Sequence, residues 1–288
     1  MKPAPFDYQA PATLREAIGL LGSHPEAAVI AGGQSLMPVL AFRLATPSLL
    51  VDLRRIRELD YIGVDEDGVR LGALVRLRAV EDDRRLVTAH PLLREAVAHV
   101  AHYQIRNRGT VGGSLAHADP AAELPGVAVT CEGEITLAGL AGSRTVAADE
   151  FFTGPLSTLR RPDEIISELH LPSWPADRRW AFREFARQEG DFALAGILLF
   201  YDKDDSGAVS NAHVGVIGAC HLPHRLHEVE ALLNGRVLEE RLIRRAAAVA
   251  AEEVDPPDDL HADAAYRRGL VATLVERALR ATVEKGSA

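Results

Sequence analysis

The chain has 288 residues, of which 47% are hydrophobic and 25% charged, the composition of an ordinary globular protein. Its formal net charge of −9, with scattered positive residues, argues against nucleic-acid binding. Only two cysteines occur, Cys131 and Cys220, which excludes a disulfide framework and any cluster held by four cysteines of this chain. No apolar run could cross a bilayer, and segment 1–8 lacks the apolar core of a signal peptide. We therefore expect a cytoplasmic protein without membrane insertion.

The N-terminal part predicts a helix between two strands. Thr13 and Glu16 form a capping-box pair ahead of an apolar stripe at helical spacing, and Gly22 marks the expected end of this helix. Short apolar strands are expected at 27–31 and 49–53. This order of elements indicates a small α/β unit.

A second unit begins near Tyr61. The segment 61–72 predicts a hairpin around an Asp-Glu-Asp-Gly turn. A helix is expected at 91–102, before a glycine-rich loop. Further strands are expected at 127–137, 144–146 and 165–171.

The pattern changes beyond a proline-containing linker at 172–175. The elements expected there are strands at 179–186, 193–201 and 208–219, then helices at 226–233, 239–252 and 264–285. Strands followed by helices predict an α+β domain whose strands form a three-stranded antiparallel sheet.

The first chemically informative segment is Ala31-Gly32-Gly33-Gln34-Ser35, which follows a short apolar strand. Paired glycines permit a positive φ and let another group approach the backbone closely. Consecutive N–H groups in such a turn form an anion-binding nest, to which Ser35 and Gln34 add side-chain donors. The segment suits a pyrophosphate, and it is equally compatible with a tight turn that binds nothing.

A second glycine segment, Arg108-Gly109-Thr110-Val111-Gly112-Gly113-Ser114, again places glycines among hydroxyls. Small and polar residues follow at 116–123, and small residues let a flat cofactor lie close to the backbone. Glu123 is a candidate acceptor for sugar hydroxyls, whereas a turn with a helix cap at Asp119 is the alternative. Two such segments in one chain favour a dinucleotide ligand.

Several other site types are absent from the sequence. There is no Gly-x-Gly-x-x-Gly after a strand and no Walker A lysine, which disfavours a Rossmann dehydrogenase and a P-loop NTPase. Cys220 and three nearby histidines are interrupted by Pro223, so we expect no metal site there. We find no credible catalytic triad and predict no catalytic residue.

Segments 31–35, 106–114 and 118–125 resemble the FAD-binding medium subunit of molybdenum hydroxylases. This family includes the carbon monoxide dehydrogenase medium subunit and the FAD-binding domain of xanthine dehydrogenase. Further matching segments are 6–8 with Pro11, 151–154, 163–166 and 190–193. The resemblance covers essentially the whole chain.

The resemblance implies an α+β fold with two domains. Residues 1–174 would form an FAD-binding domain of two α/β subdomains, at about 1–56 and 57–174, of the vanillyl-alcohol oxidase type. Residues 175–288 would form the small C-terminal α+β domain. The implied function is electron transfer through FAD, between the two-iron two-sulfur clusters of a small subunit and an external acceptor. Substrate oxidation would occur on a large molybdopterin-binding subunit.

The resemblance also implies cofactor-binding residues. These are Ala31, Gly32, Gly33, Gln34, Ser35, Leu36, Gly109, Thr110, Gly112, Gly113, Ser114, Ala116, His117, Asp119, Glu123, Leu159, Arg183 and Phe192. Segments 31–35 and 110–114 would wrap the pyrophosphate, and His117 and Glu123 would lie near the ribityl and adenosine part. Leu159 would lie near the flavin or the adenine. Arg183 stands where the xanthine dehydrogenase relatives have a lysine near the flavin. Phe192 would cover one flavin face, unless it is an ordinary core residue.

Two other functions are compatible with these residues. One is a free-standing flavoenzyme with its own substrate pocket, although the C-terminal part shows no clear acid–base groups. The other is a non-catalytic assembly protein that has lost its flavin, although intact glycines in both segments argue against it.

Overall fold

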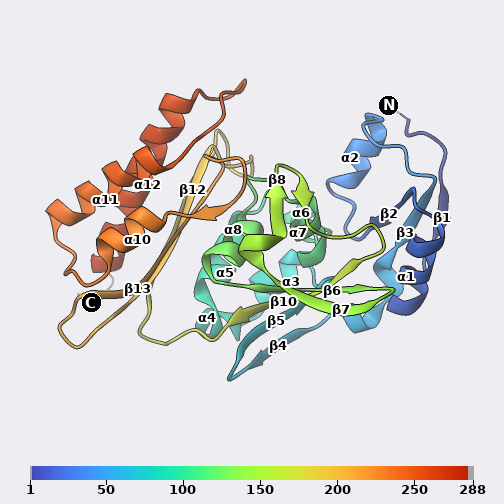
Figure 1. The fold of residues 1–288 in the computed structure, drawn as a ribbon, viewed down its shortest axis with the longest axis horizontal. Helices are drawn as coiled ribbons and strands as arrows, with labels where there is room; N and C mark the ends of the chain where they lie inside the picture. The colour runs from blue at the N-terminus through green and yellow to red at the C-terminus, as the bar shows by residue number, and fades with distance from the viewer. Residues whose placement is uncertain (1, 285–288) are drawn as a thin grey trace.

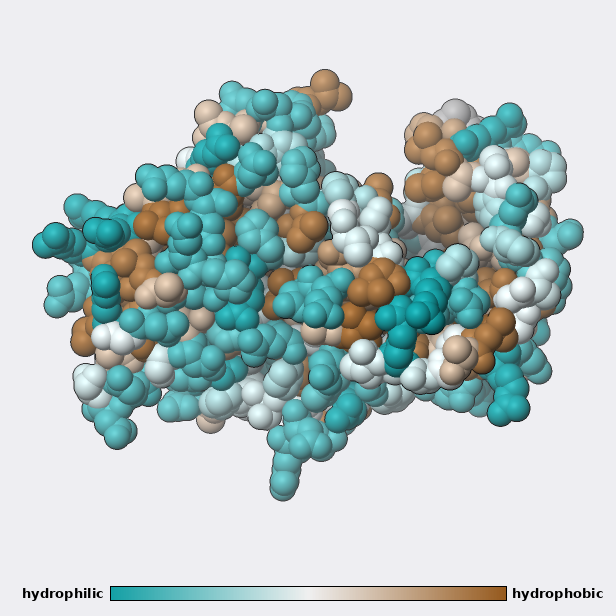
Figure 2. Space-filling model, in the orientation of Figure 1, coloured by the Kyte–Doolittle hydropathy of each residue, from teal (hydrophilic) through white to brown (hydrophobic). Residues whose placement is uncertain are grey.

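The computed structural model of this chain describes residues 2–284. The molecule is elongated, and its parts follow one another along the long axis (Figure 1). We refer to residues 2–56 as the N-terminal unit, 57–174 as the middle unit and the remainder as the C-terminal unit. The N-terminal unit lies at one end, and the C-terminal helices lie at the other (Figure 1). The surface is hollowed between the N-terminal unit and the rest of the molecule (Figure 2). None of the described helices has the length and hydropathy needed to span a bilayer.

The N-terminal unit contains a parallel sheet of order β1-β3-β2. Its elements are β1 (Asp7–Gln9), α1 (Leu14–Ser23), β2 (Ala27–Ile30), α2 (Leu36–Ala41) and β3 (Leu49–Asp52), followed by a 3₁₀ turn at Leu53–Arg55. A second 3₁₀ turn, at Arg57–Leu59, begins the middle unit. The Thr13 side chain accepts a hydrogen bond from the N–H of Glu16 and caps α1, as predicted. Glu16 Oε2 accepts from the N–H of Ala12, one residue before the position that a capping box requires.

The middle unit is built on an antiparallel sheet of order β4-β5-β10-β6-β7. Its strands are β4 (Ile62–Asp65), β5 (Gly68–Gly72), β6 (Glu134–Gly139), β7 (Gly142–Ala147) and β10 (Ile165–Pro172), with a separate pair β8 (Phe152–Gly154) and β9 (Ser157–Thr158). Its helices are α3 (Leu77–Asp82), α4 (Leu86–Ala89), α5 (Pro91–His99), α6 (Tyr103–Arg106), α7 (Val111–His117), α8 (Glu123–Thr130) and α9 (Ala148–Phe151).

Two sequence predictions for this unit were wrong in part. Residues 127–130, expected in a strand, belong to helix α8, all of whose residues are buried, and the strand begins only at Glu134. A segment that is apolar on every side has no periodicity that separates a buried helix from a buried strand. The second glycine segment is mostly the first turn of α7 and not a loop, since the Thr110 side chain caps that helix.

The C-terminal unit places three long strands and three helices in the predicted order. The strands are β11 (Arg179–Phe185), β12 (Ala195–Lys203) and β13 (Val209–Ile217), and the two-residue β14 (His224–Arg225) extends the antiparallel sheet beside β13. The helices are α10 (His227–Leu233), α11 (Glu240–Glu253) and α12 (Ala264–Glu284). The predicted end of the last helix, at Lys285, lies outside the described residues.

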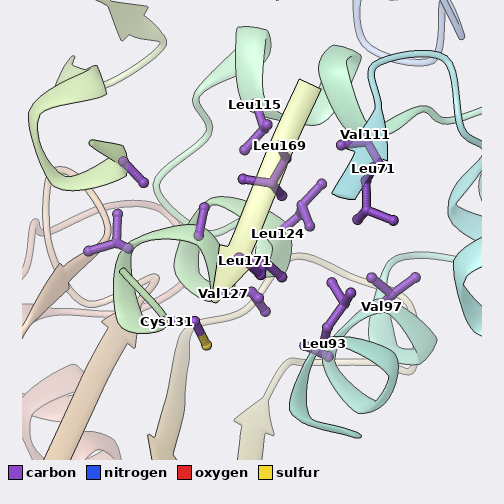
Figure 3. Packing of buried hydrophobic residues seen from close by; sticks show 14 of the residues in the cluster. Leu71, Leu93, Val97, Val111, Leu115, Leu124, Val127, Cys131, Leu169 and Leu171 are labelled. Carbon is purple, nitrogen blue, oxygen red and sulfur yellow. The ribbon is translucent and has the colours of Figure 1, made fainter. Parts of the chain in front are cut away.

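Helix α8 connects the middle unit to the C-terminal sheet. Leu124 and Val127 of α8 pack with side chains from α5, α7, β5 and β10 in the largest core cluster (Figure 3). The opposite side of the helix meets β13, where a Cβ on Gly126 would lie 2.4 Å from Cγ2 of Ile217. This close contact requires glycine, and it places the C-terminal sheet directly beside the segment that follows α7.

Candidate cofactor site

A cavity of about 580 Å³ lies where the two glycine segments meet. Its walls come from the N-terminal unit through 27–36, from the middle unit, and from the C-terminal unit through 190–192. This volume is in the usual range for small-molecule sites, about 300–1,000 Å³. The hollow in Figure 2 lies beside the N-terminal unit, which supplies this part of the cavity wall.

The first glycine segment presents unpaired backbone donors to this cavity. Gly33 has φ +74°, which turns the chain sharply between β2 and α2. Within the described part of the chain, the N–H groups of 33–36 donate to no protein acceptor, and the Ser35 hydroxyl has no hydrogen-bond partner. Neighbouring free N–H groups of this kind bind anions, and a pyrophosphate is a suitable one.

The two glycine segments touch through their backbones. A Cβ on Gly32 would lie 2.3 Å from the carbonyl oxygen of Arg108 and 3.0 Å from Cα of Gly109. The guanidinium of Arg76 donates to the same Arg108 oxygen. Any side chain larger than hydrogen at Gly32 would therefore separate the segments, so this glycine is required for packing.

The second glycine segment does not form a nest. The N–H of Val111 donates to the Val75 carbonyl (3.0 Å), and that of Gly112 to the Ala73 carbonyl (2.8 Å). The N–H of Gly113 donates to the Thr110 hydroxyl oxygen at 3.2 Å. The N–H groups of Val111, Gly112 and Gly113 are therefore paired within the protein. A Cβ on Gly112 would lie 2.6 Å from Cβ of Ala73, and one on Gly113 would lie 2.8 Å from the Thr110 hydroxyl oxygen, so both glycines are required for packing within the middle unit.

Glu123 is the most strongly perturbed acid on the cavity wall. It is the first residue of α8 and only 6% exposed. Burial, reinforced by the nearby carboxyl of Glu184, raises the pKa of Glu123 to about 8. The side chain therefore holds a proton at neutral pH and can donate a hydrogen bond as well as accept one.

Most of the predicted site residues line this cavity. They are Ala31, Gly32, Gly33, Gln34, Ser35, Leu36, Gly109, Thr110, Gly112, Gly113, Ser114, Ala116, His117, Asp119, Glu123 and Phe192. Phe192 is 66% exposed, so it is not a core residue. Leu159 and Arg183 are not among the lining residues: Leu159 packs against the middle core, and Arg183 lies on β11 with Nη1 donating to the Phe182 carbonyl.

The sequence did not indicate several lining residues. Arg160 takes the place expected for Leu159, and Ile30, Leu53 and Ile105 add apolar wall. Residues after β9 have no regular structure, so no periodicity in the sequence shows which side chain faces inward. The apolar residues carry no chemical signal that distinguishes them from core residues.

Comparison with known proteins identifies the family. Residues 4–174 match the family described as the FAD binding domain in molybdopterin dehydrogenase. The chain belongs to this family. Residues 180–282 match the carbon monoxide dehydrogenase flavoprotein C-terminal domain. The predicted family, fold class and FAD cofactor are thereby confirmed, and the chain is an FAD-binding oxidoreductase subunit of the molybdenum hydroxylase type.

Relatives of this family match the chain over its whole length. The 6-hydroxypseudooxynicotine dehydrogenase complex subunit alpha of Paenarthrobacter nicotinovorans is 39% identical, over 97% of this chain and 95% of the relative. The nicotine 6-hydroxylase medium subunit of the same organism is 37% identical, over 100% and 99%.

Solved structures give the same result. A carbon monoxide dehydrogenase chain from Hydrogenophaga pseudoflava superposes with a TM-score of 0.95 at 34% identity, over 99% of both chains. A chain of quinoline 2-oxidoreductase from Pseudomonas putida 86 superposes with a TM-score of 0.94 at 36% identity, over 99% of both chains.

Proposed function

We propose that this chain is the electron-transfer subunit of a heterotrimeric molybdenum hydroxylase. It accepts electrons from the two-iron clusters of a small subunit and passes them to an external acceptor, while a large molybdopterin-binding subunit oxidises the substrate. When bound, FAD supplies the one- and two-electron chemistry that such a transfer requires. The cytoplasmic location expected from the sequence remains part of this proposal.

The observation that carries the proposal is the row of free N–H groups at 33–36 beside a cavity of about 580 Å³. A second observation concerns the metal clusters. The two cysteines of the chain, Cys131 and Cys220, are free and buried. Burial raises the pKa of the Cys220 thiol to about 12, which disfavours the thiolate that binds metal. Clusters that exchange electrons with this chain therefore belong to partner subunits.

The residues of the chain fit FAD in a simple division of roles. The N–H groups of 33–36 and the Ser35 hydroxyl would hold the pyrophosphate, and Ser114, beside the glycines at 112–113 on the cavity wall, would add a hydroxyl. Glu123, which is protonated, exchanges hydrogen bonds with sugar hydroxyls. Phe192 covers the exposed end of the cavity. We retain the sixteen predicted residues that line the cavity as the proposed site and omit Leu159 and Arg183.

We also propose a division into domains at residue 174. Residues 1–174 supply most of the cavity, and residues 175–288 close it through 190–192. The family matches at 4–174 and 180–282 support this division.

The test is purification of the chain from its native source. We expect it to co-purify with one chain that binds molybdenum and one that binds iron and sulfide. The flavin should be reduced rapidly by the organic substrate only when all three are present. Slow reaction with artificial donors is compatible with the proposal, because the flavin remains reactive. Rapid, saturable oxidation of an organic substrate by this chain alone, without molybdenum, would favour a free-standing flavoenzyme instead.

A further inference from the structure

One arginine on the cavity wall has hydrogen-bond partners, in the part of the chain that the structure describes, for only one of its guanidinium nitrogens. Arg160 is half-buried and lines the cavity. Its Nη1 donates to the carbonyl oxygens of Arg161 (2.9 Å) and Glu164 (2.7 Å), which closes the loop before β10. Among residues 2–284, Nε and Nη2 of Arg160 have no hydrogen-bond partner, and the side chain forms no salt bridge.

The charge of Arg160 is poorly compensated. The carboxylate that attracts it most, Glu164, is already bound by Arg144 through two hydrogen bonds, at 2.7 and 2.9 Å, and by the N–H of Arg161 at 2.7 Å. Burial lowers the pKa of Arg160, and the attraction of Glu164 and Asp163 opposes this only in part. A ligand that brings negative charge or an aromatic face to Arg160 would stabilise the positive charge that burial disfavours.

The cavity has two distinguishable ends. Arg160 is held to Glu164 by a hydrogen bond, and the next residue, Ile165, packs in the core cluster that the N-terminal unit shares with Leu74 and Ala138, so Arg160 belongs to the end of the cavity beside that unit. Phe192 lies on a loop of the C-terminal unit, where a Cβ on Gly190 would fall 2.3 Å from the ring of His102. The end near Phe192 is exposed, as the 66% exposure of that ring shows. A cofactor that exchanges electrons with other subunits needs its redox ring at the exposed end.

We propose that Arg160 binds the AMP half of FAD. Its planar guanidinium lies against the adenine, and its free Nε and Nη2 groups donate to oxygens of the same half. A guanidinium is suited to both contacts, because it stacks on aromatic rings and carries donors at fixed angles. The inference rests on the proposed FAD site. It adds that Arg160 makes the chain prefer FAD, the dinucleotide, to FMN, the mononucleotide.

The experiment compares three ligands on the full-length chain freed of flavin. FAD, ADP and FMN are titrated by calorimetry into wild type, Arg160→Met and Arg161→Met. Methionine keeps the apolar stem of arginine and removes the guanidinium. We expect Arg160→Met to weaken FAD and ADP binding about tenfold, the value of one partly desolvated cation–aromatic contact, while FMN binding changes less than twofold. Arg161→Met is the matched control, because Arg161 is exposed and does not line the cavity, and it should bind all three like wild type.

The remaining outcomes separate this inference from the FAD site itself. Equal weakening of FMN, or unchanged FAD and ADP binding in a folded Arg160→Met protein, overturns the inference. Failure of the wild type to bind FAD overturns the proposed site as well. If Arg160→Met does not fold, Arg160→Lys is used, since lysine keeps a donor for the loop carbonyls and lacks the planar group. The lysine variant should still lose ADP affinity several-fold, and wild-type affinity would overturn the inference.

Discussion

Gly32 and Arg108 are in backbone contact, so close that a Cβ on Gly32 would lie 2.3 Å from the Arg108 carbonyl oxygen. This contact joins the N-terminal unit to the middle unit at the cavity. The first glycine segment is therefore held in place by packing as well as by its own turn.

Replacement of Gly32 by Ala should separate the two segments. The carbonyl of Arg108 is held by Arg76, so it cannot move freely, and we expect a loss of about 1–3 kcal/mol in the free energy of unfolding together with a strong loss of bound FAD. Flavin absorbance per protein and thermal unfolding measure both effects. Gly19→Ala is the matched control, since a Cβ there meets nothing within 4 Å, and helix propensity predicts an unchanged or slightly stabilised protein.

Replacement of Gly33 by Val should act through the backbone. Its φ of +74° is costly for a β-branched residue, by about 1–2 kcal/mol, so the turn that presents the N–H groups of 33–36 should be distorted. We expect FAD content to fall severely while the circular dichroism spectrum stays largely unchanged. Gly33→Asn, which tolerates a positive φ, should retain more flavin. Near-normal flavin in the valine variant would mean that the segment is only a turn.

The cofactor released from the protein should be the dinucleotide. The cavity extends from residues of β2 to Phe192, and FMN would leave the N-terminal end of this space empty. Purified protein should be yellow, and acid or heat should release FAD when the supernatant is analysed by chromatography. Release of FMN, or of no flavin from well-folded protein, would contradict the assignment.

Stability of the flavin-free protein should fall with rising pH because of Glu123. Its folded pKa of about 8 lies above the ordinary value of about 4.3, so the folded state holds a proton that the unfolded state has released across this interval. The free energy of unfolding should then fall as the pH rises toward 8, by at most about 1.4 kcal/mol per pH unit.

The comparison is cleanest between pH 7 and 8. Below this window His90, whose pKa burial lowers to about 3, acts in the opposite direction, because the unfolded state takes up a proton that the folded state refuses. Glu184, whose pKa burial raises to about 7, adds to the pH dependence of unfolding mainly near pH 7 and below. Urea unfolding at both pH values should show a smaller decrease for Glu123→Gln than for wild type. Equal slopes would show that Glu123 is ionised in the folded protein.

The sequence predicted those features that depend on local chemistry. The cap at Thr13 and the glycine turn at Gly33 were correct, because a capping hydroxyl and a positive φ leave specific residues in the chain. Helix α8 was assigned partly to a strand, because it is surrounded by protein and its apolar residues follow no period. Short helices such as α3 and α6 were missed, since helices of this length depend on tertiary packing.

The sequence predicted the site residues that belong to glycine and hydroxyl motifs, and it missed those whose position on the cavity wall depends on tertiary contacts. Gly32 was identified, but its contact with Arg108 joins segments far apart in sequence and cannot be derived from either one. The sequence placed Leu159 at the cofactor, whereas Arg160 lines the cavity, because tertiary contacts set the orientation of side chains in an irregular loop.

Because the cavity is walled by all three units, its ligand is also a structural element of the subunit. A molecule that binds only the folded chain adds about 2.7 kcal/mol of stability at a free concentration one hundred times its dissociation constant. Bound flavin should therefore stabilise the folded chain against unfolding. A chain without flavin should therefore be cleaved by protease sooner than the flavin-bound chain, and first at the seam where the N-terminal and middle units meet around the cavity.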